Sequence, residues 1–157
     1  MVPTHKSRSV RATSTSLRET RTFPKPRWRQ VSSATESAKD LARIAARAAD
    51  DKQGLDITIL DVSNVLAITE LFMITSASNS RQVKSIASEI TDKVRESLGR
   101  SPLHSEGVGE QQWVLLDYGD VVIHVFADEA RRFYEIERLY SDMPKVAFEP
   151  NIPESHS

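Results

Sequence analysis

The chain has 157 residues, with 21 Lys and Arg against 22 Asp and Glu, and 39% of its residues are hydrophobic. This length suits one ordinary domain, and no apolar run approaches the roughly 18 residues that a membrane-spanning helix needs. Because the chain has no cysteine, disulfides, thiolate metal sites and a cysteine nucleophile are excluded.

Charge is unevenly distributed along the chain. Residues 1–30 carry eight basic residues and a single acid, Glu19, which leaves 13 basic and 21 acidic residues for the remainder. Residues 1–32 also contain three prolines and no sustained periodicity, so we expect a disordered basic leader. Three interpretations stay open: residues translated ahead of a true start near Val31, an organellar transit peptide, or an arm that binds nucleic acid. We favour the first, because the leader stops where the first helix signal begins.

The first half of the remaining sequence predicts two helices and two strands. The segment 33–36, Ser-Ala-Thr-Glu, matches a capping box, with Ser33 as the cap of an Ala-rich amphipathic helix. Residues 57–62 and 71–75 predict strands, and the apolar segment 65–70 between them should pack as a short turn. A long helix should then follow the polar residues 76–80 and end before Gly99, with a core stripe of Val83, Ile86, Ala87, Ile90, Val94 and Leu98.

The second half predicts three strands and a helix. Residues 102–105 suit an edge strand, and 113–117 and 120–126 form a hairpin through Tyr118-Gly119. Asp128 should cap a final helix that buries Phe133, Ile136, Leu139 and Tyr140. Residues 33–146 therefore predict one α/β (α+β) domain, a mixed sheet of about five strands flanked by helices, and 147–157 a loose tail.

Most catalytic and metal-binding signatures are missing from the sequence. The four histidines are scattered, and no glycine-rich nucleotide fingerprint is complete. His124 lies in an alternating strand and is expected to be a hydrogen-bonded structural residue. Asp61, Asp117 and Asp120 could hold Mg²⁺ for nucleotidyl or phosphoryl transfer, although aspartates beside a tight turn more often serve the turn itself. The acidic domain favours a basic protein partner over nucleic acid.

Between Leu55 and Met143 the sequence closely resembles the Iojap family, the ribosomal silencing factor S proteins. The segments that carry the resemblance are LDVS at 60–63, ITELFMI at 68–74, SNSRQV at 78–83, EG at 106–107, WVLLDYGDVVIHVF at 113–126 and RFYEIERLY at 132–140. Two positions depart mildly from the family: Glu70 stands where Asp is frequent, and Tyr140 stands where Trp is frequent.

The resemblance implies both a fold and a function. The fold would be an α/β sandwich related to nucleotidyltransferases, without their catalytic motif, which is also absent here. Members are understood to bind the large ribosomal subunit through ribosomal protein L-fourteen and to block the small subunit, which slows translation when nutrients fail. The resemblance therefore implies a translational repressor without catalysis, cofactor or metal, in the bacterial cytoplasm. Because the family has organellar members, the transit-peptide interpretation of the leader also stays open.

Binding energy at protein interfaces concentrates in a few aromatic and Arg anchors, which directs attention to Trp113 and Tyr134. Core packing is the competing interpretation for both residues, and we favour interface for Tyr134 because it lies off the predicted core stripe of its helix. Asp117 and Asp120 would face Lys or Arg of the partner, and Arg132 would pair with the partner or with Glu129 or Glu135 of its own helix. Ser80 and Arg81 should mainly serve the start of the long helix. The full set of expected partner contacts is Trp113, Asp117, Tyr118, Asp120, Arg132, Tyr134, Ser80 and Arg81.

Two further interpretations stay open. The protein could be an RNA-binding protein that acts through its basic leader, with the acidic core making no direct contact with ribosomal RNA. It could also form a homodimer through an exposed sheet edge.

Overall fold

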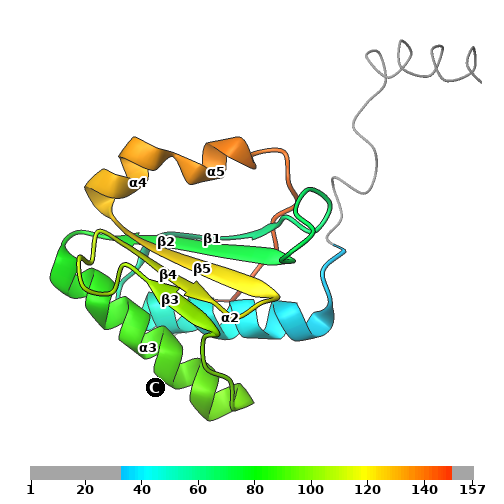
Figure 1. Ribbon diagram of the computed structural model, residues 1–157, viewed down its shortest axis with the longest axis horizontal. Helices are drawn as coiled ribbons and strands as arrows, with labels where there is room; N and C mark the ends of the chain where they lie inside the picture. The colour runs from blue at the N-terminus through cyan, green and yellow to red at the C-terminus, as the bar shows by residue number, and fades with distance from the viewer. Residues whose placement is uncertain (1–32, 150–157) are drawn as a thin grey trace, which may run out of the picture.

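The computed structural model describes residues 33–149 (Figure 1). The predicted leader 1–32 and residues 150–157 of the predicted tail lie outside the described residues. The elements, in chain order, are α2 (Glu36–Asp51), β1 (Leu55–Asp61), β2 (Leu71–Ala77), α3 (Ser80–Leu98), β3 (His104–Glu106), β4 (Trp113–Asp117), β5 (Val121–Ala127), α4 (Asp128–Tyr134) and α5 (Ile136–Leu139). Within residues 33–149, no helix is long and apolar enough to cross a bilayer.

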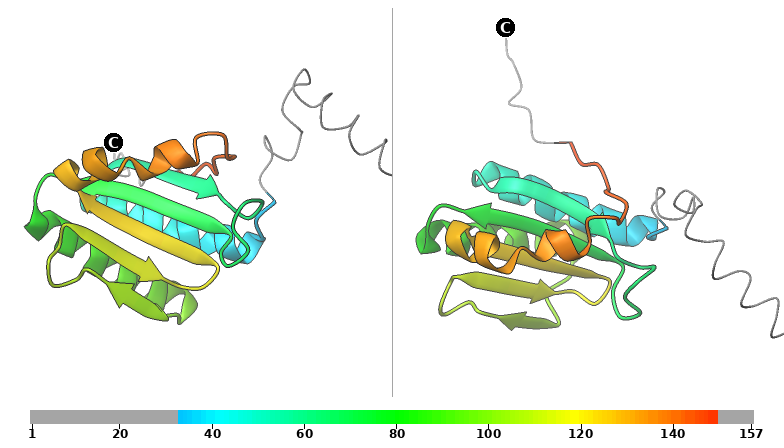
Figure 2. Two further views of the ribbon diagram at one scale, coloured as in Figure 1. Left: turned by 45° about the horizontal axis from the view of Figure 1, so that its top comes forward. Right: turned by 90° about the horizontal axis from the view of Figure 1, so that it is seen from above.

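One mixed sheet organises the domain. Its strand order is β1-β2-β5-β4-β3, in which β2 and β5 are parallel and every other neighbouring pair is antiparallel. Helices α2 and α3 cover one face of the sheet, and α4 and α5 lie across the other (Figures 1 and 2). The predicted α+β domain with a five-stranded mixed sheet is therefore confirmed.

Alternation along the strands divides the apolar side chains between two cores. Leu71 and Met73 of β2 face α2 and α3 and belong to the larger core, whereas Phe72 and Ile74 face the opposite side. The smaller core, beneath α4 and α5, consists of Leu60, Val62, Phe72, Ile74, Phe126 and Met143. This second core supports the surface on which the candidate site lies.

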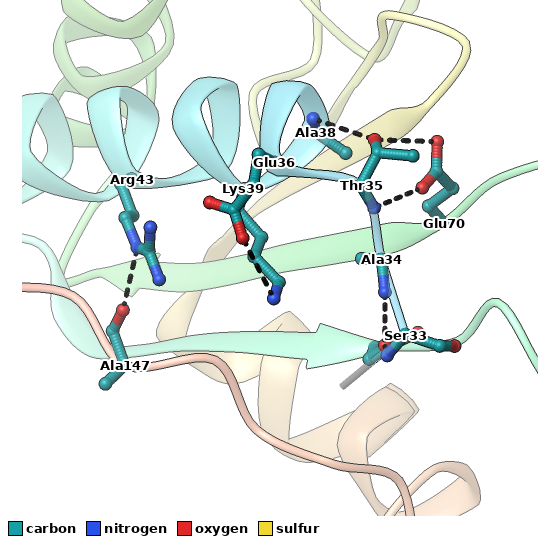
Figure 3. A network of polar contacts seen from close by, with 10 residues as sticks. Ser33, Ala34, Thr35, Glu36, Ala38, Lys39, Arg43, Glu70 and Ala147 are labelled. Carbon is teal, nitrogen blue, oxygen red and sulfur yellow. Dashed lines mark hydrogen bonds and ion pairs between the residues drawn. The ribbon is translucent and has the colours of Figure 1, made fainter. Parts of the chain in front are cut away.

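The start of α2 is held by side chains from distant segments. The N-cap is Thr35, whose Oγ1 accepts from the amide of Ala38 at 3.2 Å, so the prediction of Ser33 as the cap was wrong. The reciprocal acceptor of a capping box is supplied by Glu70, which accepts from the Thr35 amide at 2.8 Å (Figure 3). Glu36 instead pairs with Lys39 one turn along the helix. Glu70, 35 positions along the chain, thus accepts the hydrogen bond that the capping-box pattern assigned to Glu36.

Helix α3 follows its sequence pattern closely. Asn79 caps it by accepting from the Gln82 amide at 2.9 Å, and Gly99 ends it in the left-handed conformation, with φ of 66°. The predicted stripe is buried except for Leu98, which is exposed in the last turn.

The segment 65–70 differs from the prediction. Its chain turns sharply because the carbonyl of Val62 accepts from the amides of Val65 and Leu66. Only Leu66 then packs against the smaller core, and the side chain of Ile68 is 86% exposed. The segment was expected to pack as a short turn; the turn is present, but the side chains of Val65 and Ile68 are exposed.

The predicted last helix is divided into two. Asp128 is the first residue of α4 and not its cap, because the N-cap is Ala127 and makes no side-chain hydrogen bond. Glu135, at φ of 46°, ends α4 in the left-handed conformation before α5 begins. Ile136 and Tyr140 still pack against the smaller core, but Leu139 is largely exposed. The side chain of Phe133 lies outside the described part of the chain.

The segment after α5 runs back along β1. The carbonyl of Pro144 accepts from the Asp61 amide, and the Val146 amide donates to the carbonyl of Ile59. Phe148 packs against the larger core, and the carbonyl of Ala147 accepts from Arg43. The expectation of a loose tail is therefore wrong for residues 147 and 148. The β1 side of the sheet is thereby covered, whereas all three residues of β3, the strand at the other edge, are exposed.

Candidate functional site

Six rings gather on the face of the sheet that carries α4 and α5. We call this set the aromatic cluster: Phe72, Trp113, His124, Phe126, Tyr134 and Tyr140. Strand pairing brings Trp113 of β4 directly opposite Phe126 of β5, and their rings stack with centroids 4.9 Å apart. Tyr134, at the end of α4, lies over the indole with a centroid distance of 4.8 Å. The cluster thus combines side chains from β2, β4, β5, α4 and the residue after α5.

Trp113 links the smaller core to the molecular surface. Its side chain is partly buried and packs against that core, whereas the side chain of Tyr134 is 51% exposed. The two interpretations of Trp113, core and interface, are therefore compatible: one part of the ring packs inward while the residue borders an exposed tyrosine. The indole Nε1–H donates to Nδ1 of His124 at 3.2 Å.

His124 is a buried imidazole in apolar surroundings. Only 4% of it is exposed, and the edge of the Phe72 ring contacts it at a centroid distance of 4.8 Å. Burial lowers the pKa of His124 to about 4, because desolvation penalises the charged form. The ring is therefore neutral at neutral pH, and Nδ1 can accept the proton from the indole. Within the described residues, Nε2 has no hydrogen-bond partner.

This pKa predicts acid sensitivity. The folded pKa lies below the ordinary value of 6.5, so the unfolded chain binds the extra proton first as the pH falls. The contribution of neutral His124 to the free energy of unfolding is fully present above about pH 6.5 and is lost progressively between about pH 6.5 and pH 4. At about pH 5 the free energy of unfolding should be roughly 2 kcal/mol lower than at neutral pH. Urea unfolding at about pH 7.5 and pH 5 measures it. His124→Phe serves as the reference, and the prediction fails if both proteins lose the same stability.

Asp117 and Asp120, the two aspartates predicted as partner contacts, both accept hydrogen bonds within the domain at the β4–β5 turn. The Tyr118 amide donates to the carbonyl of Val121, so the two turn residues are Gly119 and Asp120, one position later than predicted. Oδ1 of Asp117 accepts from the Gly119 amide at 2.7 Å. Both carboxylate oxygens of Asp120 accept from Arg100, at 2.9 and 3.2 Å.

Arg100, which the sequence did not single out, locks this turn. Its Nη2 also donates to the carbonyl of Tyr118 at 2.6 Å, and the hydrogen bond with Asp120 raises the pKa of the guanidinium. Tyr118 itself is only 1% exposed, and burial raises the pKa of its phenol. Its expected role as a partner contact is corrected accordingly, because a buried side chain cannot reach another protein.

The three candidate Mg²⁺ ligands do not converge. Asp61 accepts from the amides of Ser33 and Ala34, while Asp117 and Asp120 serve the hairpin turn. Across residues 33–149, no group of three or more His, Asp or Glu side chains is placed to hold a metal ion. Among these residues, the three aspartates are engaged in hydrogen bonds within the domain and are not gathered as the Mg²⁺ site that was considered from the sequence.

The remaining predicted residues lie away from the aromatic rings. Arg132 is exposed on α4 and lines a groove between α4 and β1, but Glu135 pairs with Arg138 at 3.0 Å and not with Arg132. Ser80 is the first residue of α3, and its Oγ accepts from Nε2 of Gln112, the residue before Trp113. Arg81 is exposed beside it.

Gly107 supports the site in a way that the sequence pattern alone did not reveal. Its φ is 79°, and a Cβ added there would lie 1.9 Å from the carbonyl oxygen of Trp113. The loop before β4 can therefore pass close to Trp113 only because this residue is glycine.

Comparison with known proteins shows the family to which the chain is related. The family model described as "Ribosomal silencing factor during starvation", RsfS, matches residues 35–157. The chain belongs to this family. The resemblance seen in the sequence is thus confirmed, and with it a general role in ribosome silencing and translation regulation.

Individual relatives span bacteria and plastids. Ribosomal silencing factor RsfS of Bacillus subtilis is 41% identical over 106 residues, which cover 68% of this chain and 89% of the relative. The chloroplastic protein Iojap of Zea mays is 33% identical over 101 residues, covering 64% of this chain and 43% of the longer plant protein. A crystal structure of a Chromobacterium violaceum protein superimposes with a TM-score of 0.64 at 32% identity, covering 74% of this chain and 96% of that one.

Proposed function

We propose that this protein represses translation by binding the large ribosomal subunit through ribosomal protein L-fourteen and sterically blocking the small subunit under nutrient limitation. Family membership supports the general role. The observation that carries the more specific proposal is the exposed Tyr134 packed on Trp113, an aromatic pair at the surface. Such a mechanism requires a surface that docks on the large subunit and a domain large enough to exclude the small subunit, and it needs no catalytic group.

The proposed contact surface centres on Trp113 and Tyr134. Aromatic residues with a supported inner edge and an exposed outer edge are typical anchors of protein interfaces. Asp117 and Asp120 remain partly accessible at the hairpin turn, so they contribute acidic character toward a basic partner although each has an internal hydrogen-bond partner. Arg132 adds a cation at the side of α4. Ser80 acts indirectly, through Gln112 and the start of β4.

The open edge of β3 is the second part of the proposed docking surface. Unpaired strand edges recruit further strands, so a homodimer contact would use the same residues, His104–Glu106. Docking on L-fourteen and dimerisation through this edge would then exclude each other.

Trp113→Ala tests the anchor. We expect it to weaken binding to purified large subunits by roughly 30-fold, because truncating an interface anchor costs about 2 kcal/mol. Leu98→Ala is the control, since it truncates an apolar side chain that is exposed at the end of α3, the helix on the opposite face of the sheet (Figure 1). Binding is measured by cosedimentation, and circular dichroism checks folding. If folded Trp113→Ala binds large subunits like the wild type, Trp113 is not an anchor of the interface.

Removing residues 1–30 separates this proposal from RNA binding through the leader. In our proposal the shortened protein still cosediments with large subunits and lowers the yield of joined ribosomes. If the leader supplies the affinity, the shortened protein folds but no longer binds large subunits or naked ribosomal RNA. We place the protein in the bacterial cytoplasm on the strength of its bacterial relatives, with the transit-peptide interpretation of the leader as the alternative suggested by its chloroplastic ones.

A further inference from the structure

His124 is an unexpected residue for its environment. It is buried on the smaller-core face of β5, between positions where Val122 and Phe126 contribute apolar side chains. One of its nitrogens accepts a hydrogen bond from Trp113, and the other has no partner among the described residues. A buried polar group without a partner lowers stability, so an apolar residue would suit the core better. The single bond to Trp113 is the feature that an apolar residue could not supply.

That bond fixes the indole in one orientation. Stacking on Phe126, at an interplanar angle of 28°, holds the plane of the ring but leaves rotation within it weakly opposed. The hydrogen bond to Nδ1 at 3.2 Å is directional and anchors the Nε1 edge toward β5. With this edge held, the indole ring keeps the orientation in which Tyr134 packs on it, at a centroid distance of 4.8 Å.

We propose that His124 is a positioning residue for partner binding: it orients Trp113, and through Trp113 the exposed ring of Tyr134. This inference rests on the proposed function, because it assigns a role within the same contact surface. A neutral imidazole whose Nδ1 accepts must carry its proton on Nε2, the nitrogen that points into apolar surroundings. The low pKa of His124 keeps this acceptor available throughout the neutral range.

A double-mutant cycle on the full chain tests the coupling. His124→Phe keeps a ring of similar size and removes the acceptor, and Trp113→Phe keeps an aromatic ring and removes the donor. We expect each to weaken binding to purified large subunits five- to tenfold, and the double variant to be no weaker than the weaker single variant, since both remove the same bond. His124→Asn places an amide oxygen near the position of Nδ1 and should restore most of the affinity. Fully independent effects of the two changes would overturn the proposal.

A spectroscopic readout separates positioning from general stability. The chain has two tryptophans, Trp28 and Trp113, so Trp113→Phe identifies the indole N–H signal of Trp113 in a nitrogen–proton correlation spectrum. His124→Phe should shift this signal and speed its hydrogen exchange at least tenfold, while unfolding in urea remains cooperative. An unchanged indole signal in folded His124→Phe would refute the positioning role. If His124→Phe does not fold, His124→Leu, which also lacks an acceptor, replaces it in the binding and indole measurements.

The outcomes distinguish this inference from the function on which it rests. If folded Trp113→Ala binds like the wild type, the contact surface itself is wrong. If Trp113→Ala weakens binding while His124→Phe leaves it unchanged, the contact surface stands and the positioning role of His124 is rejected.

Discussion

Gly107→Ala is expected to lower the free energy of unfolding by about 4 kcal/mol, because a left-handed backbone and a steric overlap are penalised together. At φ of 79°, an alanine is strained before any contact is considered. Its Cβ would also lie 1.9 Å from the carbonyl oxygen of Trp113, and a backbone atom cannot move aside as a flexible side chain does.

The same substitution should weaken partner binding without touching the partner. Relief of the overlap has to displace either the loop or the start of β4, and Trp113 is the first residue of that strand. In the fraction that still folds, the indole would therefore lose its alignment with His124 and Phe126. We expect lower affinity for large subunits together with a changed indole N–H signal.

Gly109→Ala is the matched control in the same loop. Its backbone does not have positive φ, and nothing lies within 4 Å of an added Cβ. Its stability should change by less than about 1 kcal/mol, with a slight gain from the less flexible unfolded chain. Urea unfolding measures both variants. Comparable losses at the two positions would show that the close approach of Gly107 to Trp113 is unimportant.

The parts of the fold that the sequence predicted well are set by neighbouring residues. Helix α3 has its cap, apolar stripe and terminal glycine within one segment, and strand β4 has the predicted bounds 113–117. The hairpin was displaced by only one residue, since Tyr118 still pairs with Val121. Patterns of this kind depend on residues a few positions apart, which a single sequence displays directly.

The parts that could not be predicted depend on residues far apart in the sequence. The amide of Thr35, the cap of α2, donates to Glu70, and Asp120 pairs with Arg100, a contact that the sequence pattern did not indicate. The aromatic side chains of the site were identifiable one by one. Their contact was not, because Trp113 meets Phe126 through strand pairing and Tyr134 through the position of α4. The break at Glu135 has no local signal, because this left-handed position, at φ of 46°, is not occupied by the glycine or asparagine that usually ends a helix.

Asp61→Ala is the second substitution for which we expect a large effect, a loss of about 4 kcal/mol, because it removes a buried charge that many donors surround. The carboxylate is 1% exposed. Oδ2 accepts from the amides of Ser33 and Ala34 at 2.6 and 3.1 Å, and Oδ1 accepts from the amide and hydroxyl of Ser63. It thereby joins the entry to α2, the end of β1 and the loop that follows.

Asp40→Ala provides the control, because Asp40 is an exposed aspartate on α2, and its replacement should change stability by less than about 1 kcal/mol. Urea unfolding gives the free energies, and amide hydrogen exchange at Ala34 should become faster only in Asp61→Ala. A similar small change in both variants would show that the buried carboxylate contributes little.

The binding behaviour of Asp61→Ala separates folding from recognition. Asp61 is the last residue of β1, and its carboxylate accepts hydrogen bonds from Ser33, Ala34 and Ser63, none of which belongs to the aromatic cluster. At a temperature where the variant remains folded, its affinity for large subunits should therefore equal that of the wild type. Trp113→Ala should show the opposite pattern, with weak binding that persists in a well-folded protein. If Asp61→Ala loses affinity while folded, the contact surface extends to the start of α2, beyond the rings and strand edge to which we assign it.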